Sequence, residues 1–199
     1  MDALLQNLIN LTRLEGKAIE PILQFFTPVK VSAKAILLEP GSVSQTAWFI
    51  GHGILRAYTI VQENKRSGNL DDGDLLDREI TNWIVPENGF LTDIKSFLHQ
   101  TPSRYFIEAL EPSRLYKHDY KNYQAIQQSY PEVAQIIFEN TLIMADLRVQ
   151  MCNLRNPINR LQMFEKMYPG MSGRISVSIQ ASYLNIDRAT LSRLRGKIK

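Results

Sequence analysis

Seven short apolar segments follow one another between residues 29 and 117. They are rich in β-branched and aromatic residues, and turn signals such as Pro40-Gly41 and Asn88-Gly89 separate them. The segments are VKV (29–31), AILL (35–38), TAWFI (46–50), ILRAYTIV (54–61), REITNWIV (78–85), YFIEAL (105–110) and SRLYK (113–117). Strands at this spacing predict an antiparallel β-roll or barrel.

Helical patterns flank these strands. Residues 3–26 form the first, with Leu4, Leu8 and Leu11 on one face, and DYKNYQAIQQSY (119–130) forms a short helix that ends before Pro131. A long helix is predicted from Pro131 to about residue 155, because proline is accepted in a first helical turn.

The long helix carries apolar residues at alternating spacings of four and three, as in the seam of a coiled coil. The seam consists of Val133, Ile137, Asn140, Met144, Leu147, Met151 and Leu154. A polar residue such as Asn140 inside a seam can fix the register of two paired helices, so we expect this face to form a homodimer. The alternative is that the face packs on its own domain.

The last part of the chain predicts a helix-turn-helix. Asn156-Pro157 ends the long helix, INRLQMFEKMYP (158–169) is amphipathic, and RISVSI (174–179) reads as a short strand. In ASYLNIDRATLSRLRGK (181–197), Asn185 suits a turn position with positive φ, and Asp187 suits the cap of the second helix.

On that second helix, residues four apart share an outward face that can enter a major groove. Flanking polar and basic residues suit phosphates. The expected DNA contacts are Arg188, Ala189, Thr190, Ser192, Arg193, Arg195 and Lys197.

Charge supports a polyanion as partner. Residues 154–199 hold nine Lys or Arg against two acidic residues, a net +7, whereas the whole 199-residue chain is only +3. The basic end therefore predicts double-stranded DNA as a partner, with a solvated basic tail as the alternative. The sequence has no membrane span and no secretory signal, so we expect a cytoplasmic protein with no membrane partner.

Together these patterns predict an α+β protein in three parts. Residues 1–130 form a β-roll sensor domain, residues 131–155 a dimerisation helix, and residues 156–199 a helix-turn-helix DNA-binding domain. The expected function is a dimeric DNA-binding transcription regulator.

Nearly the whole chain resembles the Crp/Fnr transcription regulators, in their short form common in Bacteroidetes. The stretches that carry the resemblance are LEPGSVSQTAWFIGHGILRAY, REITNWIVPENGFLTDIKSFLHQTPSRYFIEAL and ASYLNIDRATLSRLR. In the last stretch, the family's motif is matched by Ala181, Leu184, Ile186, Thr190, Leu191, Ser192 and Arg193. Asn185 stands for a glycine and Ala189 for a base-reading glutamate, so the operator of better-known members is not expected.

The resemblance implies a jelly roll like that of cyclic nucleotide-binding domains and a winged-helix-like unit with a truncated wing, since Lys199 stands where longer members continue. It further implies DNA and a second copy as partners, and RNA polymerase as a candidate one.

The family's phosphate-binding cassette also resembles one stretch, which defines the candidate effector pocket as Thr92, Asp93, Ser103 and Arg104. Thr92 replaces a glycine that lets the phosphate approach, Asp93 replaces a longer glutamate, and Arg104 lies one position late, which on a strand reverses its side. We therefore expect no cyclic nucleotide; the effector is open, and the alternative is a pocket filled by its own side chains.

Other chemistries find little support. The single Cys152 excludes an iron–sulfur cluster, which takes four thiolates, and His52, His99 and His118 are scattered. A cupin-like enzyme, or a β-roll binding protein with no DNA role, is the rival hypothesis, but no H-x-H pair or catalytic set is present. The acids at 71–74 predict a solvated hairpin tip rather than a calcium loop. We expect no enzyme, no cofactor and no metal site.

Overall fold

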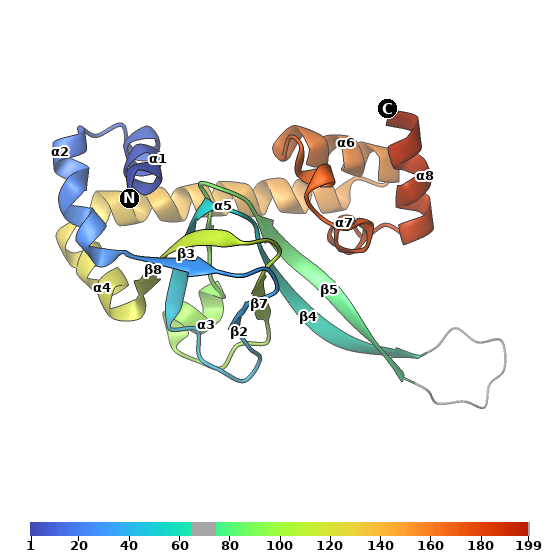
Figure 1. Ribbon diagram of the computed structural model, residues 1–199, viewed down its shortest axis with the longest axis horizontal. Helices are drawn as coiled ribbons and strands as arrows, with labels where there is room; N and C mark the ends of the chain where they lie inside the picture. The colour runs from blue at the N-terminus through green and yellow to red at the C-terminus, as the bar shows by residue number, and fades with distance from the viewer. Residues whose placement is uncertain (65–74, 199) are drawn as a thin grey trace.

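The computed structural model describes residues 1–64 and 75–198, which form a β-roll with helices along one side and at one end (Figure 1). The roll and the helices before it comprise α1 (Asp2–Thr12), α2 (Gly16–Ile19), η1 (Glu20–Phe25), β1 (Thr27–Val31), β2 (Ile36–Leu38), β3 (Thr46–His52), β4 (Leu55–Asn64), β5 (Leu75–Val85), β6 (Phe90–Leu91), α3 (Ile94–His99), β7 (Phe106–Ala109) and β8 (Ser113–Asp119). Then follow α4 (Tyr120–Ser129), α5 (Pro131–Asn153), α6 (Pro157–Met167), η2 (Met171–Gly173), α7 (Val177–Leu184) and α8 (Arg188–Ile198).

Two antiparallel sheets make the roll, as the alternation of short apolar segments predicts. Their strand orders are β1-β8-β3-β6 and β2-β7-β4-β5. All seven predicted strands are present, and the two-residue strand β6, which pairs with β3, was too short to predict. The inward side chains of the two sheets form one buried core: Leu38, Ile50, Leu55, Ala57, Leu91, Ile107, Ala109 and Leu115.

Strands β4 and β5 form the longest hairpin, which projects away from the roll (Figure 1). Their pairing runs from Leu55↔Val85 to Asn64↔Leu75, so the strands extend further than the sequence pattern predicts. The acidic residues 71–74, predicted to form a solvated tip, lie outside the described residues.

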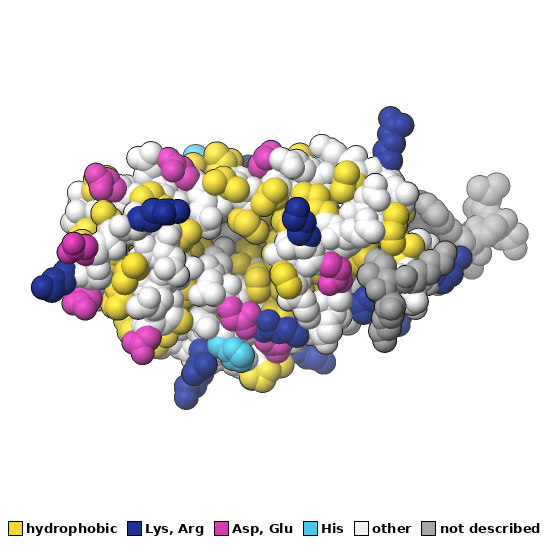
Figure 2. Space-filling view, turned by 90° about the horizontal axis from the view of Figure 1, so that it is seen from above, with side chains coloured by type: hydrophobic (Ala, Val, Ile, Leu, Met, Phe, Trp, Pro, Cys, Tyr) yellow, Lys and Arg dark blue, Asp and Glu magenta, His cyan; other side chains and the backbone are white. Residues whose placement is uncertain are grey.

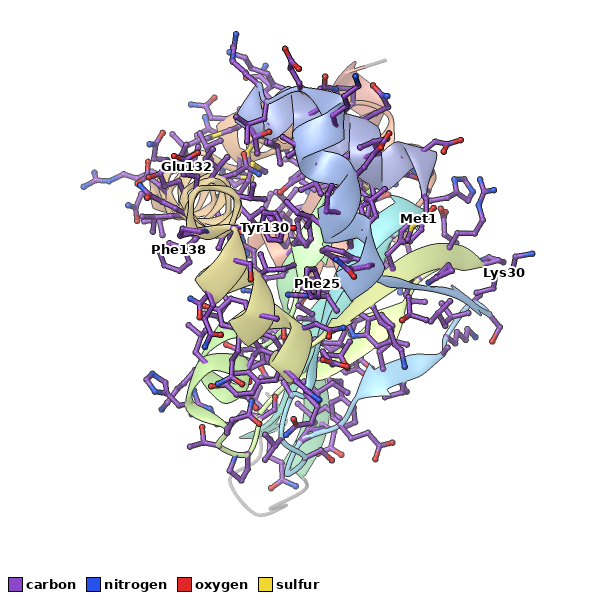
Figure 3. All side chains as sticks on the ribbon, turned by 90° about the vertical axis from the view of Figure 1, so that its left-hand side faces the viewer. Met1, Phe25, Lys30, Tyr130, Glu132 and Phe138 are labelled. Carbon is purple, nitrogen blue, oxygen red and sulfur yellow. The ribbon has the colours of Figure 1, made fainter. Side chains whose placement is uncertain are left out.

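Helix α5 packs against both ends of its own chain. Near its start, Val133 is buried with Leu4, Leu8 and other residues of the N-terminal helices. Tyr130, just before α5, meets the ring of Phe25 edge-on with centroids 6.3 Å apart (Figure 3). Near its end, α5 joins a second core that includes the C-terminal helices.

This packing corrects the predicted dimer face. Val133 and Met151 are buried within the chain, and Ile137 and Met144 pack against the same two cores. Asn140 and Leu147 lie half-buried on this inward face. A heptad pattern shows that one face of a helix is apolar, but it does not say whether a second chain or the helix's own domain covers that face.

Helices are the only regular secondary structure in the described residues 157–198 of the C-terminal unit. The segment RISVSI, predicted as a strand, instead leads through a turn to Ser176, and its last three residues begin helix α7. Ser176 caps that helix, because its side chain accepts a hydrogen bond from the amide of Ile179 at 3.2 Å. No helix in the described part of the chain is both long and apolar enough to cross a membrane.

Gly53, in the turn between β3 and β4, is a position where only glycine fits. Its φ is +105°, and an added Cβ would collide with the side chain of Ser113 and lie 3.0 Å from the Cα of that residue. We predict that Gly53→Ala lowers the free energy of unfolding by at least about 2 kcal/mol, through backbone strain and this clash.

Gly173→Ala is the matched control, because a Cβ there meets nothing within 4 Å. Denaturant unfolding of both variants checks the prediction, with the control within about 0.5 kcal/mol of the parent. Equal losses in the two variants would contradict it.

Candidate functional site

The turn between α7 and α8 has the geometry that its sequence predicts. Asn185 adopts the left-handed conformation with φ +50°, and the carboxylate of Asp187 accepts hydrogen bonds from the amides of Ala189 at 2.9 Å and Thr190 at 3.1 Å. The cap fixes where α8 begins and therefore which of its residues face outward. Arg160 adds a tie that sequence reasoning missed, since its guanidinium donates to the carbonyls of Leu184 and Asn185.

The outward face of α8 is polar and basic. Arg188, Ala189, Ser192 and Arg193 are exposed, while Leu191 on the opposite side is fully buried. The guanidinium of Arg193 lies along its own helix, where it donates to the carbonyl of Ala189 and to the half-buried Thr190 hydroxyl, each at 3.3 Å. These contacts are exposed and weak, so the side chain is able to turn toward a ligand.

Arg195 does not share that freedom. Its Nε donates to Oε1 of the buried Gln180 at 2.7 Å, and Nη2 donates to the carbonyl of Ser172 at 2.9 Å. Its guanidinium thus ties α8 to α7 and η2, which corrects the expectation that it is free for phosphates. The side chain of Lys197 lies outside the described residues.

Three of the four residues of the predicted effector pocket, Thr92, Asp93 and Ser103, are held in hydrogen bonds within the protein. Asp93 caps α3 through the amide of Ser96, and its second oxygen accepts from the hydroxyl of Ser103 at 2.7 Å. The hydroxyl of Thr92 donates to the carbonyl of Thr46 at 3.0 Å and lies 3.0 Å from that of Ser44. The polar groups that a phosphate or ribose needs are therefore already paired.

Arg104, the fourth residue of that pocket, is exposed on the surface. A hollow of about 320 Å³ is lined by residues 36–39 and 42–46 together with Trp48. It shares Ser44 and Thr46 with the hydrogen bonds of Thr92, so it adjoins the cassette.

The helix-turn-helix docks on the roll through strand β5, which is the edge of its sheet. The amide of Thr81 donates to the hydroxyl of Ser182 on α7 at 2.8 Å, and this hydroxyl donates to the carbonyl of Glu79 at 3.0 Å. An edge strand has unpaired backbone groups, and Ser182 satisfies two of them.

A second docking contact comes from α5. The guanidinium of Arg148 lies 3.8 Å above the ring of Tyr183, which is fully buried and whose hydroxyl is 3.3 Å from that of Tyr168. Burial raises the pKa of Tyr183 above its usual value, so the ring stays neutral and can face a cation.

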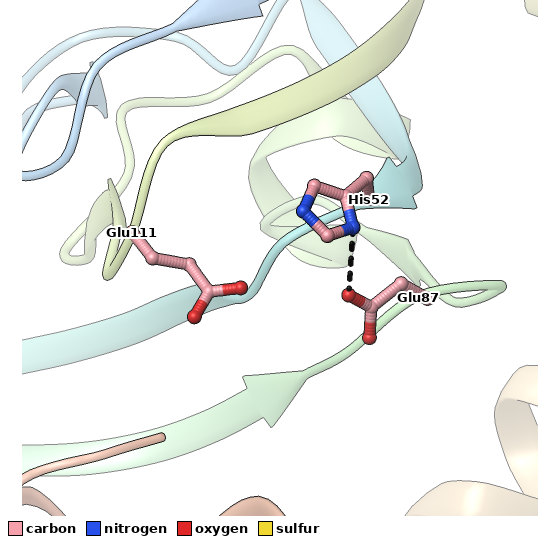
Figure 4. Close-up of side chains that lie close together, drawn as sticks. All are labelled: His52, Glu87 and Glu111. Carbon is pink, nitrogen blue, oxygen red and sulfur yellow. Dashed lines mark ion pairs between the residues drawn. The ribbon is translucent and has the colours of Figure 1, made fainter.

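A third contact between the C-terminal unit and the roll is a cluster of charged side chains at the end of the roll. Arg174, between η2 and α7, donates to both oxygens of Glu87 at 2.6 and 2.9 Å and also to the carboxylate of Glu111. His52 Nδ1 lies 3.4 Å from Glu87 Oε1 (Figure 4). The hydrogen bond from Arg174 lowers the pKa of Glu87 to about 2. Viewed from above, acidic, basic and histidine side chains also lie together on the molecular surface (Figure 2).

Solved structures resemble the whole arrangement at low sequence identity. The catabolite activator protein of Thermus thermophilus shares 18% identity, with a TM-score of 0.54 over 96% of this chain and 86% of that one. The c-di-GMP responsive global regulator CLP of Xanthomonas campestris shares 14%, with a TM-score of 0.64 over 92% and 91%. A CooA mutant from Carboxydothermus hydrogenoformans shares 18%, with a TM-score of 0.61 over 91% and 82%.

The fold is that of the Crp/Fnr transcription regulators. The match confirms the predicted α+β architecture of β-roll, long helix and C-terminal helices. No protein-family model and no curated protein sequence matches the chain. At these identities the likeness establishes the Crp/Fnr fold alone.

Within the Crp/Fnr fold, sequence reasoning missed the cluster of His52, Glu87 and Glu111. These residues stand 35 and 24 positions apart in the sequence, so no local spacing links them. The Gly51-His52-Gly53 turn was the one available signal, since it marks a sharp turn at the end of a strand. The sequence also gives no sign that Arg174 pairs with Glu87 and Glu111.

The self-paired cassette leads to a prediction about ligands. We predict that cyclic AMP and cyclic GMP at about 1 mM shift the melting temperature by less than about 1 °C, because only a ligand that binds the folded state stabilises it. Differential scanning fluorimetry checks this, with Arg104→Ala as the companion variant. A shift of several degrees that Arg104→Ala abolishes would show that the cassette opens to the nucleotide.

Proposed function

We propose that the chain is a dimeric DNA-binding transcription regulator. In this proposal, residues 1–130 sense an effector, α5 joins two copies, and residues 156–199 bind double-stranded DNA. The observation that carries it is the outward face of α8, where exposed Arg188, Ala189, Ser192 and Arg193 follow directly on the capped turn. A helix presented in this way fits the major groove, and two guanidinium groups can each reach the acceptors of a guanine.

Charge supports the same conclusion. The net +7 of residues 154–199 is concentrated in the unit that carries α8, whereas the rest of the chain is net negative. Lys and Arg near phosphates release counterions and supply sequence-independent affinity. The basic unit therefore suits DNA, and the solvated-tail alternative does not explain why Arg188 and Arg193 both lie on the exposed side of a capped helix.

A selected operator and random duplex DNA distinguish the roles of these residues. We predict that Arg193→Ala narrows the affinity gap between operator and random DNA by about 1 to 3 kcal/mol, because a bidentate contact with guanine is lost. Lys197→Ala is expected to leave the difference in affinity between operator and random DNA unchanged. It should lower the slope of log affinity against log salt concentration by about one. Fluorescence anisotropy across a salt series measures the affinity of each variant for both DNAs and its dependence on salt.

Lys17→Ala is the matched control for loss of one positive charge, since Lys17 is exposed on α2, in the N-terminal part of the chain. If Arg188→Ala and Arg193→Ala bind both DNAs as the parent does at every salt concentration, α8 does not enter the groove. The C-terminal unit would then be reassigned to protein contacts.

The dimer contact is proposed on the outward face of α5. Phe138, Leu142 and Val149 are 54%, 59% and 56% exposed, which is unusual for side chains of this kind on a helix between two cores. Figure 3 shows Phe138 pointing away from the roll. With Ala145 and Cys152 they stand at spacings of four and three, a second heptad seam opposite the buried one.

We predict that Leu142→Asp converts the dimer to a monomer, because the seam would bury an unpaired carboxylate. Multi-angle light scattering measures the molecular mass. The affinity for the operator should also fall when the dimer is lost. Gln150→Asp adds the same charge on α5 at an exposed position outside the seam, and should stay dimeric. A monomeric parent protein, or equal dissociation in both variants, would contradict the proposal.

A further inference from the structure

We propose that His52, Glu87 and Glu111 bind a divalent transition-metal ion, and that this ion competes with Arg174 for the two carboxylates. The three residues come from three different turns of the roll: the end of β3, the turn after β5 and the turn after β7. They meet at one end of the roll, where the C-terminal unit docks (Figure 4).

The distances suit one ion. One ligand atom from each of the three residues can be chosen so that all lie within 4.8 Å of one another, and His52 Nδ1 and Glu87 Oε1 are 3.4 Å apart. Two ligands bound about 2.1 Å from a tetrahedral ion are themselves about 3.4 Å apart. Binding of an ion requires the side chain of Glu111, which stands on a turn, to rotate, and it requires Arg174 to leave the carboxylates.

The composition of the cluster selects the class of ion. An imidazole nitrogen with two carboxylates suits Zn²⁺, Mn²⁺ or Ni²⁺, whereas Mg²⁺ and Ca²⁺ take oxygen ligands alone. The amide of Gly53 donates to Glu87 Oε1 at 2.9 Å and orients that carboxylate. The imidazole is 54% exposed, and the cluster lines an open hollow, so an ion can enter from solvent.

The cluster already binds a cation, namely the guanidinium of Arg174. That guanidinium donates to both oxygens of Glu87 and to the carboxylate of Glu111. An ion that takes these oxygens must displace Arg174, since the same lone pairs cannot serve both. Arg174 belongs to the C-terminal unit, whereas the three ligands belong to the roll, so metal binding weakens the docking between them.

This coupling deepens the proposed function and rests on it only in part. If the C-terminal unit binds DNA, a divalent metal ion becomes a candidate effector, because it favours the undocked unit over the docked one. The metal site itself does not depend on DNA. Metal binding measured without DNA can therefore fail or succeed independently of the regulator proposal.

The test is isothermal titration of the full chain with Zn²⁺, Mn²⁺ and Ni²⁺, in a Cys152→Ser background that removes the one thiol. We expect one ion per chain for at least one metal. His52→Ala should weaken binding at least tenfold, as should Glu111→Gln, while His99→Ala, which removes an exposed histidine elsewhere, should not. Arg174→Ala should tighten binding by roughly fivefold, because the competing ion pair is gone.

Tighter binding in Arg174→Ala separates a metal site from a purely structural cluster, since loss of a structural contact alone does not raise affinity for an ion. Circular dichroism confirms that each variant is folded; His52→Ala is the most informative ligand variant because its side chain is largely exposed. The proposal is overturned if no ion binds below about 1 mM, if His52→Ala binds as the parent does, or if Arg174→Ala fails to tighten binding.

Discussion

The packing of one face of α5 against two separate cores is the constraint on which the rest of the structure depends. Its inward face completes two separate cores, one with the N-terminal helices through Val133 and one with the C-terminal helices through Met151. A single rigid helix thereby fixes the distance between the two ends of the chain. The outward face keeps its own exposed apolar stripe, which is the surface proposed for the contact with a second copy.

The C-terminal unit is held to the roll by contacts of different strength. The apolar core that includes Ile54 and Ile84 of the roll is non-directional and contributes most of the stability. The hydrogen bonds of Ser182 and the ion pairs of Arg174 are directional, and they specify one docked position. Because the ion pairs are partly exposed, they are the part of the interface that a ligand or an ion can most easily exchange.

Local chemistry explains why some features could be predicted from the sequence. The strands were evident from alternating β-branched residues, and the turn before α8 from Asn185 and Asp187, whose backbone preferences act within a few residues. The start of α7 was missed because the cap at Ser176 outweighs the β propensity of the isoleucines and valine around it.

Features that depend on distant partners could not be predicted. Periodicity identified an apolar face of α5 but not what covers it, and a position on α8 did not show that Arg195 turns back to Gln180. The cluster of His52, Glu87 and Glu111 depends on three turns that meet only in the folded roll. The Crp/Fnr fold was recognisable because its strands, long helix and helix-turn-helix each leave a local pattern.

The central claim, that the outward seam of α5 joins two copies in parallel, is tested most directly by oxidative cross-linking of Cys152. It is the only cysteine, it is exposed, and it lies on the seam. A disulfide needs Cα atoms within about 7 Å, which two seam positions of a parallel pair approach and positions off the seam do not. The account predicts a covalent dimer for the parent protein, and also for the double variant Val149→Cys with Cys152→Ser. It predicts no covalent dimer for the double variant Gln150→Cys with Cys152→Ser. Cross-linking of all three to the same extent, or of none, would contradict it.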